Sequence, residues 1–198
     1  MRRIGIFVYY DAEELDFVGP LEVFGAAGRL RPDTFEVSTV GDSGREVRGT
    51  YGLRVKPNHS FRRCPKMDIL IIPGGRGERR EMKNLRALQF VKKRAENCEY
   101  VASVCTGALI LARAGLLNGR RATTHWSALD ELRRFSNVQV EHRRYIRHGR
   151  IVTSGGISAG IDMALYLVGL FHGPRLRREV AHRMEYFEKG PKIALGTQ

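Results

Sequence analysis

The segment of residues 100–117, YVASVCTGALILARAGLL, changes its pattern at Cys105. Residues 100–104 form a short apolar run that is typical of a buried strand. Residues 108–117 have apolar side chains at helical spacing, and the Asn118-Gly119 pair that follows is a common helix end. A strand that leads at once into a helix restricts the fold to classes in which the two elements alternate. Cys105 stands at the junction.

The same alternation runs along most of the chain. Strands are predicted over residues 4–10, 35–40, 67–72, 100–104, 138–141 and 150–153, and helices over residues 15–27, 84–97, 108–117, 158–171 and 176–187. A hairpin is expected over residues 45–55, and a turn at His148 and Gly149 between the last two strands. This order predicts the α/β class, as a single-domain, three-layer sandwich of flavodoxin-like type around a mainly parallel sheet. Residues 1–189 are expected to form the domain and residues 190–198 a loosely held tail.

Length and cysteine usage narrow the class of protein. A chain of 198 residues, 42% of them hydrophobic, is about one domain long and does not need metal or disulfide support. The three cysteines and six histidines lack metal-ligand spacing, so we expect no metal site, and Cys64 and Cys98 are interpreted as structural. No signal peptide or membrane-spanning segment is predicted, and a reducing, cytoplasmic location is expected.

The chain is strongly basic, with a formal charge of +13 and a pI near 10.2. Such a charge raises the question of a nucleic-acid partner, because clustered Lys and Arg displace counterions from phosphates. The basic residues are dispersed, however, and no DNA-reading helix or RNA-binding motif accompanies them. We therefore favour an arginine-rich solvated surface over a specific nucleic-acid site.

The junction at Cys105 is a place where an α/β sheet binds ligands. Ligands bind at the carboxyl ends of parallel strands, and the start of a helix offers free amides and the positive end of its dipole. The amides of Thr106 and Gly107 are therefore expected to favour the thiolate form of Cys105. The alternative is that Cys105 is a small apolar side chain in the core.

Four blocks of the sequence resemble the ThiJ/PfpI superfamily, which shares its fold with type-one glutamine amidotransferase domains. They are LDFVGPLEVFGAA at residues 15–27, IIPGG at residues 71–75, SVCTGALILARAGLLNGRRATTHW at residues 103–126 and TSGGISAGIDMAL at residues 153–165. Within the superfamily the chain is most similar to the isocyanide hydratase branch and to the amidotransferase-like domain of AraC-type regulators. The resemblance covers nearly the whole chain.

The resemblance implies a set of catalytic residues. Cys105 would be the nucleophile on a sharp strand-to-helix turn, and Asp16 would be its carboxyl partner, because the D-x-x-G-P-x-x-V pattern of the hydratase branch starts at Asp16. The backbone amides of the Gly74-Gly75 loop and of Thr106 would form an anion-stabilising pocket. The alternatives are a first-turn acid for Asp16 and a helix cap for Thr106.

The remaining blocks imply a pocket wall. His125, Trp126, Gly155, Gly156 and Ile157 are expected to line the site, and Trp126 could instead form a subunit contact. Protease-like members of the superfamily place a histidine near the cysteine, so His125 as a catalytic base stays open. We favour a role for His125 in the pocket wall or in structural hydrogen bonding.

The function implied by the resemblance is hydration of a small-molecule isocyanide to an N-substituted formamide through a covalent thioimidate on Cys105. No cofactor is expected, and the superfamily implies a homodimer with its interface near the cysteine. Three alternatives stay open: a glyoxalase or deglycase, a peptidase, and a non-catalytic sensing or ligand-binding domain.

Overall fold

The central sheet has seven strands in a computed structural model that describes residues 1–187. Their order is β10-β11-β7-β6-β1-β2-β5. Every pairing is parallel except that of β10 with β11. The strands are β1 (Arg2–Phe7), β2 (Phe35–Gly41), β5 (His59–Ser60), β6 (Ile69–Ile72), β7 (Tyr100–Ser103), β10 (Tyr145–His148) and β11 (Ile151–Ser154). The predicted fold class is confirmed, whereas the predicted tail, residues 190–198, lies outside the described residues.

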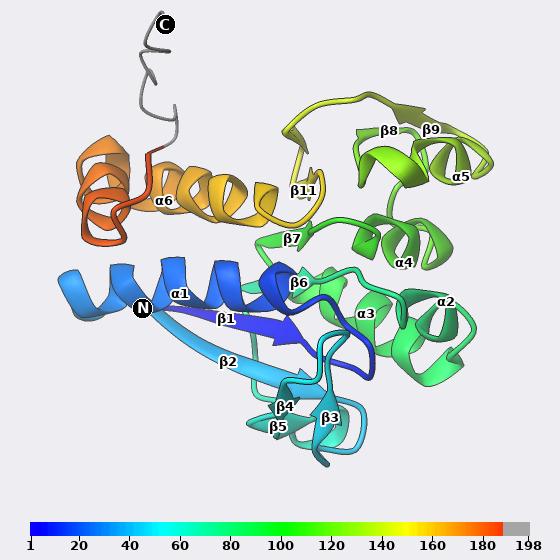
Figure 1. The fold of residues 1–198 in the computed structure, drawn as a ribbon, viewed down its shortest axis with the longest axis horizontal. Helices are drawn as coiled ribbons and strands as arrows, with labels where there is room; N and C mark the ends of the chain where they lie inside the picture. Colours follow the sequence, from blue (N-terminus) through cyan, green and yellow to red (C-terminus); the bar gives the residue numbers. More distant parts are fainter. Residues whose placement is uncertain (188–198) are drawn as a thin grey trace, which may run out of the picture.

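Helices flank the sheet, as Figure 1 shows. Helices α1 (Glu14–Leu30) and α6 (Ala159–Arg183) pack against each other, and α3 (Leu85–Asn97) contacts α4 (Gly107–Arg113). All four residues of β6 are buried, as parallel strands are when both faces of their sheet are covered. Helix α6 is interrupted at Gly173, where φ is 84°, just before Pro174. The sequence predicted this break between two helices.

Two small two-stranded sheets lie outside the central sheet. The predicted hairpin is present as β3 (Val47–Arg48) and β4 (Arg54–Val55), which pair antiparallel. Strand β8 (Arg120–Ala122) pairs parallel with β9 (Val138–Val140) in a separate sheet. The short helical segments are α2 (Glu78–Glu81), α5 (Leu129–Arg133), η1 (Phe61–Arg63) and η2 (Trp126–Ala128).

The strand assignment was wrong near the end of the sheet. We expected the turn at His148 and Gly149 to join residues 138–141 to residues 150–153, but it joins β10 to β11. Strand β10 escaped prediction because it is an edge strand with one buried residue, Ile146, among basic neighbours. The strand predicted over residues 4–10 also ends earlier, at Phe7, where the chain leaves the sheet for the loop before α1.

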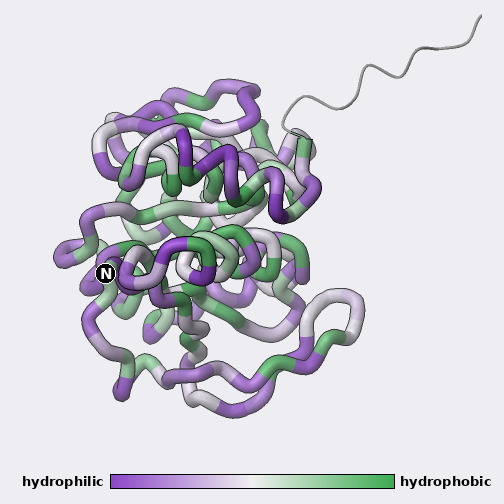
Figure 2. The backbone as a smooth tube through the Cα atoms, turned by 90° about the vertical axis from the view of Figure 1, so that its left-hand side faces the viewer, coloured by the Kyte–Doolittle hydropathy of each residue, from purple (hydrophilic) through white to green (hydrophobic). Residues whose placement is uncertain are grey.

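The core holds the sheet and its helices together. Phe7, Phe24, Ile69 and Leu109 are fully buried, and burial of one such side chain contributes about 1.5–3 kcal/mol. The hydrophobic segments run through the middle of the molecule, and the hydrophilic segments lie mostly at its periphery (Figure 2). The core therefore fixes the carboxyl ends of β1, β6 and β7, at which the candidate site lies.

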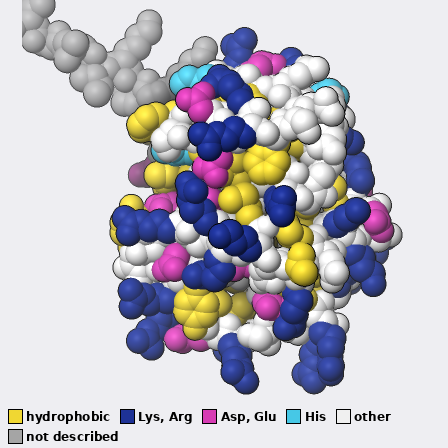
Figure 3. All heavy atoms as spheres, turned by 90° about the vertical axis from the view of Figure 1, so that its right-hand side faces the viewer, with side chains coloured by type: hydrophobic (Ala, Val, Ile, Leu, Met, Phe, Trp, Pro, Cys, Tyr) yellow, Lys and Arg dark blue, Asp and Glu magenta, His cyan; other side chains and the backbone are white. Residues whose placement is uncertain are grey.

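Basic side chains are spread over the surface. On the face shown in Figure 3 they are interspersed with acidic and apolar side chains. Many form ion pairs, such as Arg86 with Asp42 and Arg121 with Glu141. Within residues 1–187, no helix is long and apolar enough to cross a bilayer.

Candidate active site

Cys105 lies in the turn between β7 and α4, at the carboxyl edge of the sheet. Its φ is +55°, a strained value for a residue other than glycine, as expected for a sharp strand-to-helix turn. The backbone amide of Cys105 donates to the carbonyl of Gly155 at 3.0 Å, and the hydroxyl of Thr124 donates to the Cys105 carbonyl at 2.8 Å. These contacts from the segments that follow β11 and β8 hold the turn in place, and Cys105 lines a cavity.

Asp16 approaches this turn from the first turn of α1. The residue is completely buried, and its Oδ2 accepts a hydrogen bond from the amide of Gly74 at 2.9 Å. Its Oδ1 makes no hydrogen bond of normal geometry, although the Cys105 side chain and the Ile157 amide both face the carboxyl group. Burial raises the pKa of Asp16 from 3.8 to about 7, although hydrogen bonds from the Gly74 amide and the Cys105 side chain oppose the change. Asp16 therefore exchanges a proton near neutral pH.

The Cys105 thiol keeps its proton at neutral pH. Its pKa is raised to about 12, first by burial and then by the negative charge of Asp16, while the amides of Thr106 and Ile157 act in the opposite direction. Our expectation that the helix start would favour the thiolate was therefore wrong. Burial, followed by the negative charge of Asp16, outweighs the amides of Ile157 and of Thr106, which lies at the start of the seven-residue helix α4. The Cys105 side chain hydrogen-bonds the Asp16 carboxyl, which is therefore placed to accept the thiol proton.

The Gly74-Gly75 loop connects Asp16 to the cysteine turn. The amide of Gly75 donates to the Thr106 hydroxyl at 3.1 Å, and the amide of Gly74 is used by Asp16. A Cβ at Gly74 would lie 2.5 Å from the Thr106 nitrogen, so glycine is required there for this close approach. Of the three amides predicted to bind an anion, the structure leaves that of Thr106 facing the sulfur. The Thr106 hydroxyl therefore holds the loop against the cysteine turn.

His125 has its own local partners. Its Nδ1 lies 2.8 Å from the Ser127 hydroxyl and accepts from the Ser127 amide at 3.3 Å. Burial lowers the pKa of His125 from 6.5. The ring packs against Gly156, where a Cβ would lie 2.1 Å from the histidine Cδ2. The geometry is that of a pocket wall held by a serine.

The cavity beside Cys105 has a volume of about 420 Å³, within the range of small-molecule sites. It is lined by Glu13, Thr50, Tyr51, Gly75, Arg76, Glu78, Arg79, Cys105, Thr106, His125, Ser127, Ala128, Glu131 and Ile157. The sulfur is therefore reached from a space whose wall carries several charged side chains.

The comparisons with known proteins agree with this geometry. The model of the DJ-1/PfpI family matches residues 2–170. The chain belongs to the DJ-1/PfpI family. It is 37% identical over 189 residues to isonitrile hydratase of Pseudomonas putida, which covers 96% of this chain and 80% of that protein. Isonitrile is another name for isocyanide.

Two further proteins are similar to this DJ-1/PfpI family member, a transcriptional regulator and a protein of solved structure. The HTH-type transcriptional regulator CdhR of Pseudomonas aeruginosa is 30% identical over 175 residues, which cover 85% of this chain and 50% of the regulator. A ThiJ/PfpI family protein from Pseudomonas syringae has a TM-score of 0.88 and 30% identity, and the match covers 99% of this chain and 79% of that one. The resemblance found in the sequence is thereby confirmed.

Some of the residues that we predicted to line the pocket do not lie in the cavity with Cys105. Trp126, Gly155 and Gly156 line a neighbouring cavity of about 460 Å³, which shares His125 and Ile157 with the first. Trp126 is 69% exposed. These residues support or flank the cysteine cavity and do not face the sulfur within it.

Sequence analysis missed the charged side chains of α2 and α5 that line the cysteine cavity. Glu78 and Arg79 follow the Gly74-Gly75 loop after three residues, and Glu131 lies in α5. The signal was present, because a charged turn after a glycine loop at the end of β6 must lie at the same sheet edge as Cys105. Among residues 1–187, no group of three or more His, Cys, Asp or Glu side chains is placed to hold a metal ion.

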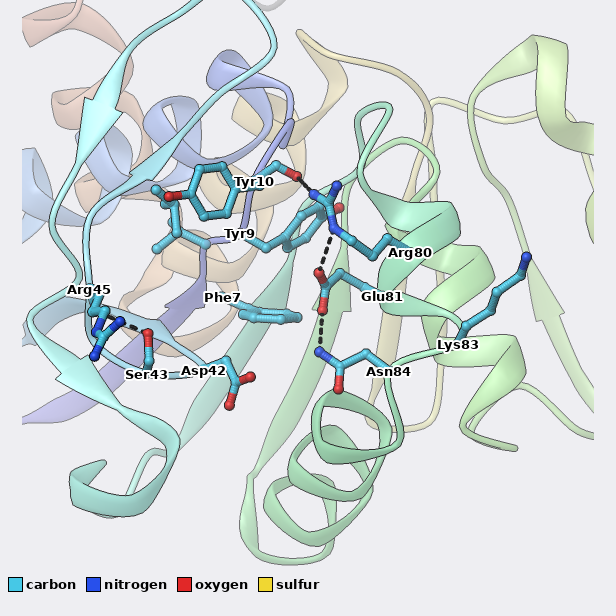
Figure 4. A pocket seen from close by; sticks show the side chains of 12 residues that line it. Phe7, Tyr9, Tyr10, Asp42, Ser43, Arg45, Arg80, Glu81, Lys83 and Asn84 are labelled. Carbon is cyan, nitrogen blue, oxygen red and sulfur yellow. Dashed lines mark hydrogen bonds and ion pairs between the residues drawn. The ribbon is translucent and has the colours of Figure 1, made fainter.

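Another cavity, of about 480 Å³, opens beyond the ends of β1 and β2 and contains none of the predicted site residues. Figure 4 shows Phe7, Tyr9 and Tyr10 along it, with Arg80 and Glu81 from α2. Tyr9 lies between this cavity and the Gly74-Gly75 loop, because its hydroxyl donates to the Pro73 carbonyl at 2.7 Å and to that of Gly74 at 3.0 Å. Helix α2 thus stands between two cavities.

Proposed function

We propose that this DJ-1/PfpI family member is a cysteine-dependent hydratase that converts an isocyanide to an N-substituted formamide. The observation that carries the proposal is the buried pair of Cys105 and Asp16, in which both pKa values are raised and a proton can pass from sulfur to carboxylate. The 37% identity to isonitrile hydratase supports the same chemistry.

The first half of the proposed reaction adds sulfur and hydrogen to one carbon. As the Cys105 sulfur attacks the terminal carbon of the isocyanide, Asp16 takes the thiol proton and then delivers it to that carbon. The product is a thioimidate, in which the former terminal carbon carries one hydrogen and is bonded to sulfur and doubly bonded to nitrogen. A carboxyl group with a pKa near 7 suits both steps, because it accepts and returns a proton at neutral pH.

The second half consumes one water. Water adds to the thioimidate carbon, the nitrogen takes up a proton, and the carbon–sulfur bond breaks to release the formamide. The departing sulfur recovers its proton through Asp16, so the thiol and the carboxylate are both restored. The amide of Thr106 faces the sulfur and would stabilise charge as it develops there.

Turnover of a simple isocyanide tests this proposal. We expect the protein to convert cyclohexyl isocyanide to the formamide, followed by proton nuclear magnetic resonance, without any added cofactor and after dialysis against a chelator. Cys105→Ala is the matched control and should lose all turnover. Formamide production by Cys105→Ala at the rate of the unchanged protein would overturn the assignment.

A sensing or ligand-binding domain is the second candidate, and the similarity to half of the regulator CdhR favours it. Such a domain would bind a small molecule without releasing product. Tight binding of an isocyanide with no formamide formed, measured by calorimetry, would favour this candidate over the hydratase. A glyoxalase or deglycase activity is less well supported, because the resemblance implies a glutamate in those branches where this chain has Asp16.

We further propose that the chain works as a homodimer. Two large apolar side chains that line the cavity with Cys105 are exposed, Tyr51 and Ile157, with exposed fractions of 78% and 37%. Exposed apolar groups that cluster in this way are commonly covered by a partner. Light scattering after size-exclusion chromatography should give about twice the 22.4 kDa chain mass, whereas a monomer would contradict the proposal. A reducing compartment such as the cytoplasm would keep Cys105 as a free thiol.

A further inference from the structure

Two glutamates lie one turn apart on α2 and face different cavities. Glu78 lines the cavity with Cys105, and Glu81 lines the cavity of Figure 4. Both are buried, with exposed fractions of 3% and 6%. They therefore form a natural comparison within the same short helix.

Glu81 has its partners within the chain. Its Oε2 accepts from the Asn84 amide at 3.0 Å, and its Oε1 lies 3.6 Å from the Arg80 guanidinium, as Figure 4 shows. Arg80 in turn donates to the Tyr10 carbonyl at 2.6 Å. This carboxylate needs no ligand to satisfy it.

Glu78 is different. Its Oε1 is buried with no hydrogen-bond partner, and the nearest cation is the Nε of Arg79 at 3.7 Å. The Arg79 guanidinium is turned toward α5, where its Nη2 donates to Glu131 at 3.1 Å. A buried carboxyl oxygen without a donor is costly, and such groups are normally paired. Arg79 divides its ion pairs between Glu78 and Glu131, so the Oε1 of Glu78 has no hydrogen-bond donor in the wall of the cavity that Cys105 lines.

The charged side chains of the cavity wall also favour a cationic or hydrogen-bond-donating ligand. Three glutamates, Glu13, Glu78 and Glu131, face two arginines, Arg76 and Arg79. Arg79 is shared between Glu131 and Glu78, and Arg76 is the cation that acts on Glu13. The wall therefore carries one excess negative charge when all three glutamates are ionised. A positively charged or donor group in the cavity would complete this set.

We propose that Glu78 is a specificity-determining residue, which selects substrates that carry an ammonium or another hydrogen-bond-donating nitrogen group at a distance from the reacting carbon. The reaction itself rests on the proposed hydratase function. The selectivity of the cavity for such a group does not depend on that function, because any reagent that reaches the Cys105 sulfur passes the same cavity wall.

Alkylation of Cys105 by reagents of different charge tests the selectivity directly. The rates of modification by 2-bromoethylammonium and by neutral iodoacetamide are measured at pH 8.5, with mass spectrometry of the Cys105 peptide. The ratio of the two rates is compared between variants, which cancels the intrinsic reactivity of each reagent. We expect Glu78→Gln to lower this ratio on the order of tenfold, as loss of a nearby opposite charge at a protein surface should.

Glu81→Gln is the matched control, because it removes a buried acid from the same helix but from the other cavity. It should leave the ratio unchanged. Glu131→Gln gives a second route if Glu78→Gln does not fold, since it releases Arg79 to pair with Glu78 and should lower the ratio in the same direction. An unchanged ratio in Glu78→Gln, or an equal fall in Glu81→Gln, would overturn the proposal.

Turnover separates this inference from the proposed function. An isocyanide with a terminal ammonium group should have a higher kcat/KM than an apolar analogue of the same length, and Glu78→Gln should remove the preference mainly through KM. If the unchanged protein hydrates neither compound, the hydratase proposal fails while the alkylation ratio still decides the role of Glu78. If both are hydrated with no preference, the role of Glu78 is refuted and the hydratase stands.

Discussion

Replacement of Asp16 by asparagine should make the fold more stable at alkaline pH while it removes activity. The folded protein holds the Asp16 proton up to about pH 7, whereas the unfolded chain releases it near pH 3.8. The stability that this group contributes is therefore complete below pH 3.8 and is lost as the pH rises toward 7. Asparagine has no charge to bury, so the variant lacks this loss.

The magnitude follows from the two pKa values. The difference between 3.8 and about 7 corresponds to about 4 kcal/mol at pH 8, and about 3 kcal/mol of it develops between pH 5 and pH 8. Asparagine can still accept from the Gly74 amide, but its own amide group then faces the amide of Ile157, which also points at this carboxyl. That conflict costs about 1–3 kcal/mol. The variant should therefore be about 1–3 kcal/mol more stable than the parent at pH 8.

Urea unfolding followed by circular dichroism at pH 5, 6, 7 and 8 measures this effect. The exposed Glu96→Gln serves as a control, which should follow the parent at every pH. Turnover of Asp16→Asn should fall by about 10²- to 10⁴-fold, as expected when a general acid–base is lost. If the stability of Asp16→Asn depends on pH as steeply as that of the parent, Asp16 does not hold a proton in the fold and our account of the pair with Cys105 is refuted.

Three further changes have defined outcomes. Iodoacetamide should modify Cys105 before Cys64 or Cys98, because only Cys105 lines the cysteine cavity, and peptide mapping that finds another order would contradict this. His125→Gln should keep most of the turnover. If His125 were the base, its lowered pKa would give the activity of the parent a pH-dependent limb below 6.5, and that limb would be absent from the variant; we expect no such limb in the parent. Gly75→Ala should lower the free energy of unfolding by at least about 1–3 kcal/mol in a denaturant titration, because φ is 114° there and the new Cβ would lie 2.2 Å from a backbone nitrogen.

The sequence was sufficient for the elements that carry their own periodic signal. Residues 69–72 form an unbroken apolar run, and the structure has a fully buried strand there, because both faces of a parallel sheet are covered at its middle. Strand β10 has no such signal, since three of its four residues are not fully buried and its pairing with β11 decides its place. Edge strands depend on their neighbours more than on their own composition.

For the site, the sequence determined which residues meet. Asp16 follows β1, the Gly74-Gly75 loop follows β6 and Cys105 follows β7, and the carboxyl ends of neighbouring parallel strands must lie at one edge. What the sequence could not give is the protonation of the pair, because pKa values depend on burial and on distances in three dimensions. The expected thiolate is a protonated thiol, and the carboxylate beside it titrates near neutrality.

The charged wall of the cavity was decided by tertiary structure alone. Glu78 and Glu81 stand in the same four-residue segment and look equivalent in sequence, yet one finds Asn84 and Arg80 and the other finds no hydrogen-bond partner at one of its oxygens. The difference arises because Arg79 is drawn to Glu131, which lies 52 residues further along the chain. The order of residues along the chain therefore determined the sheet edge at which the candidate site lies. The packing of α5 against that edge determined which glutamate keeps an oxygen without a hydrogen-bond donor.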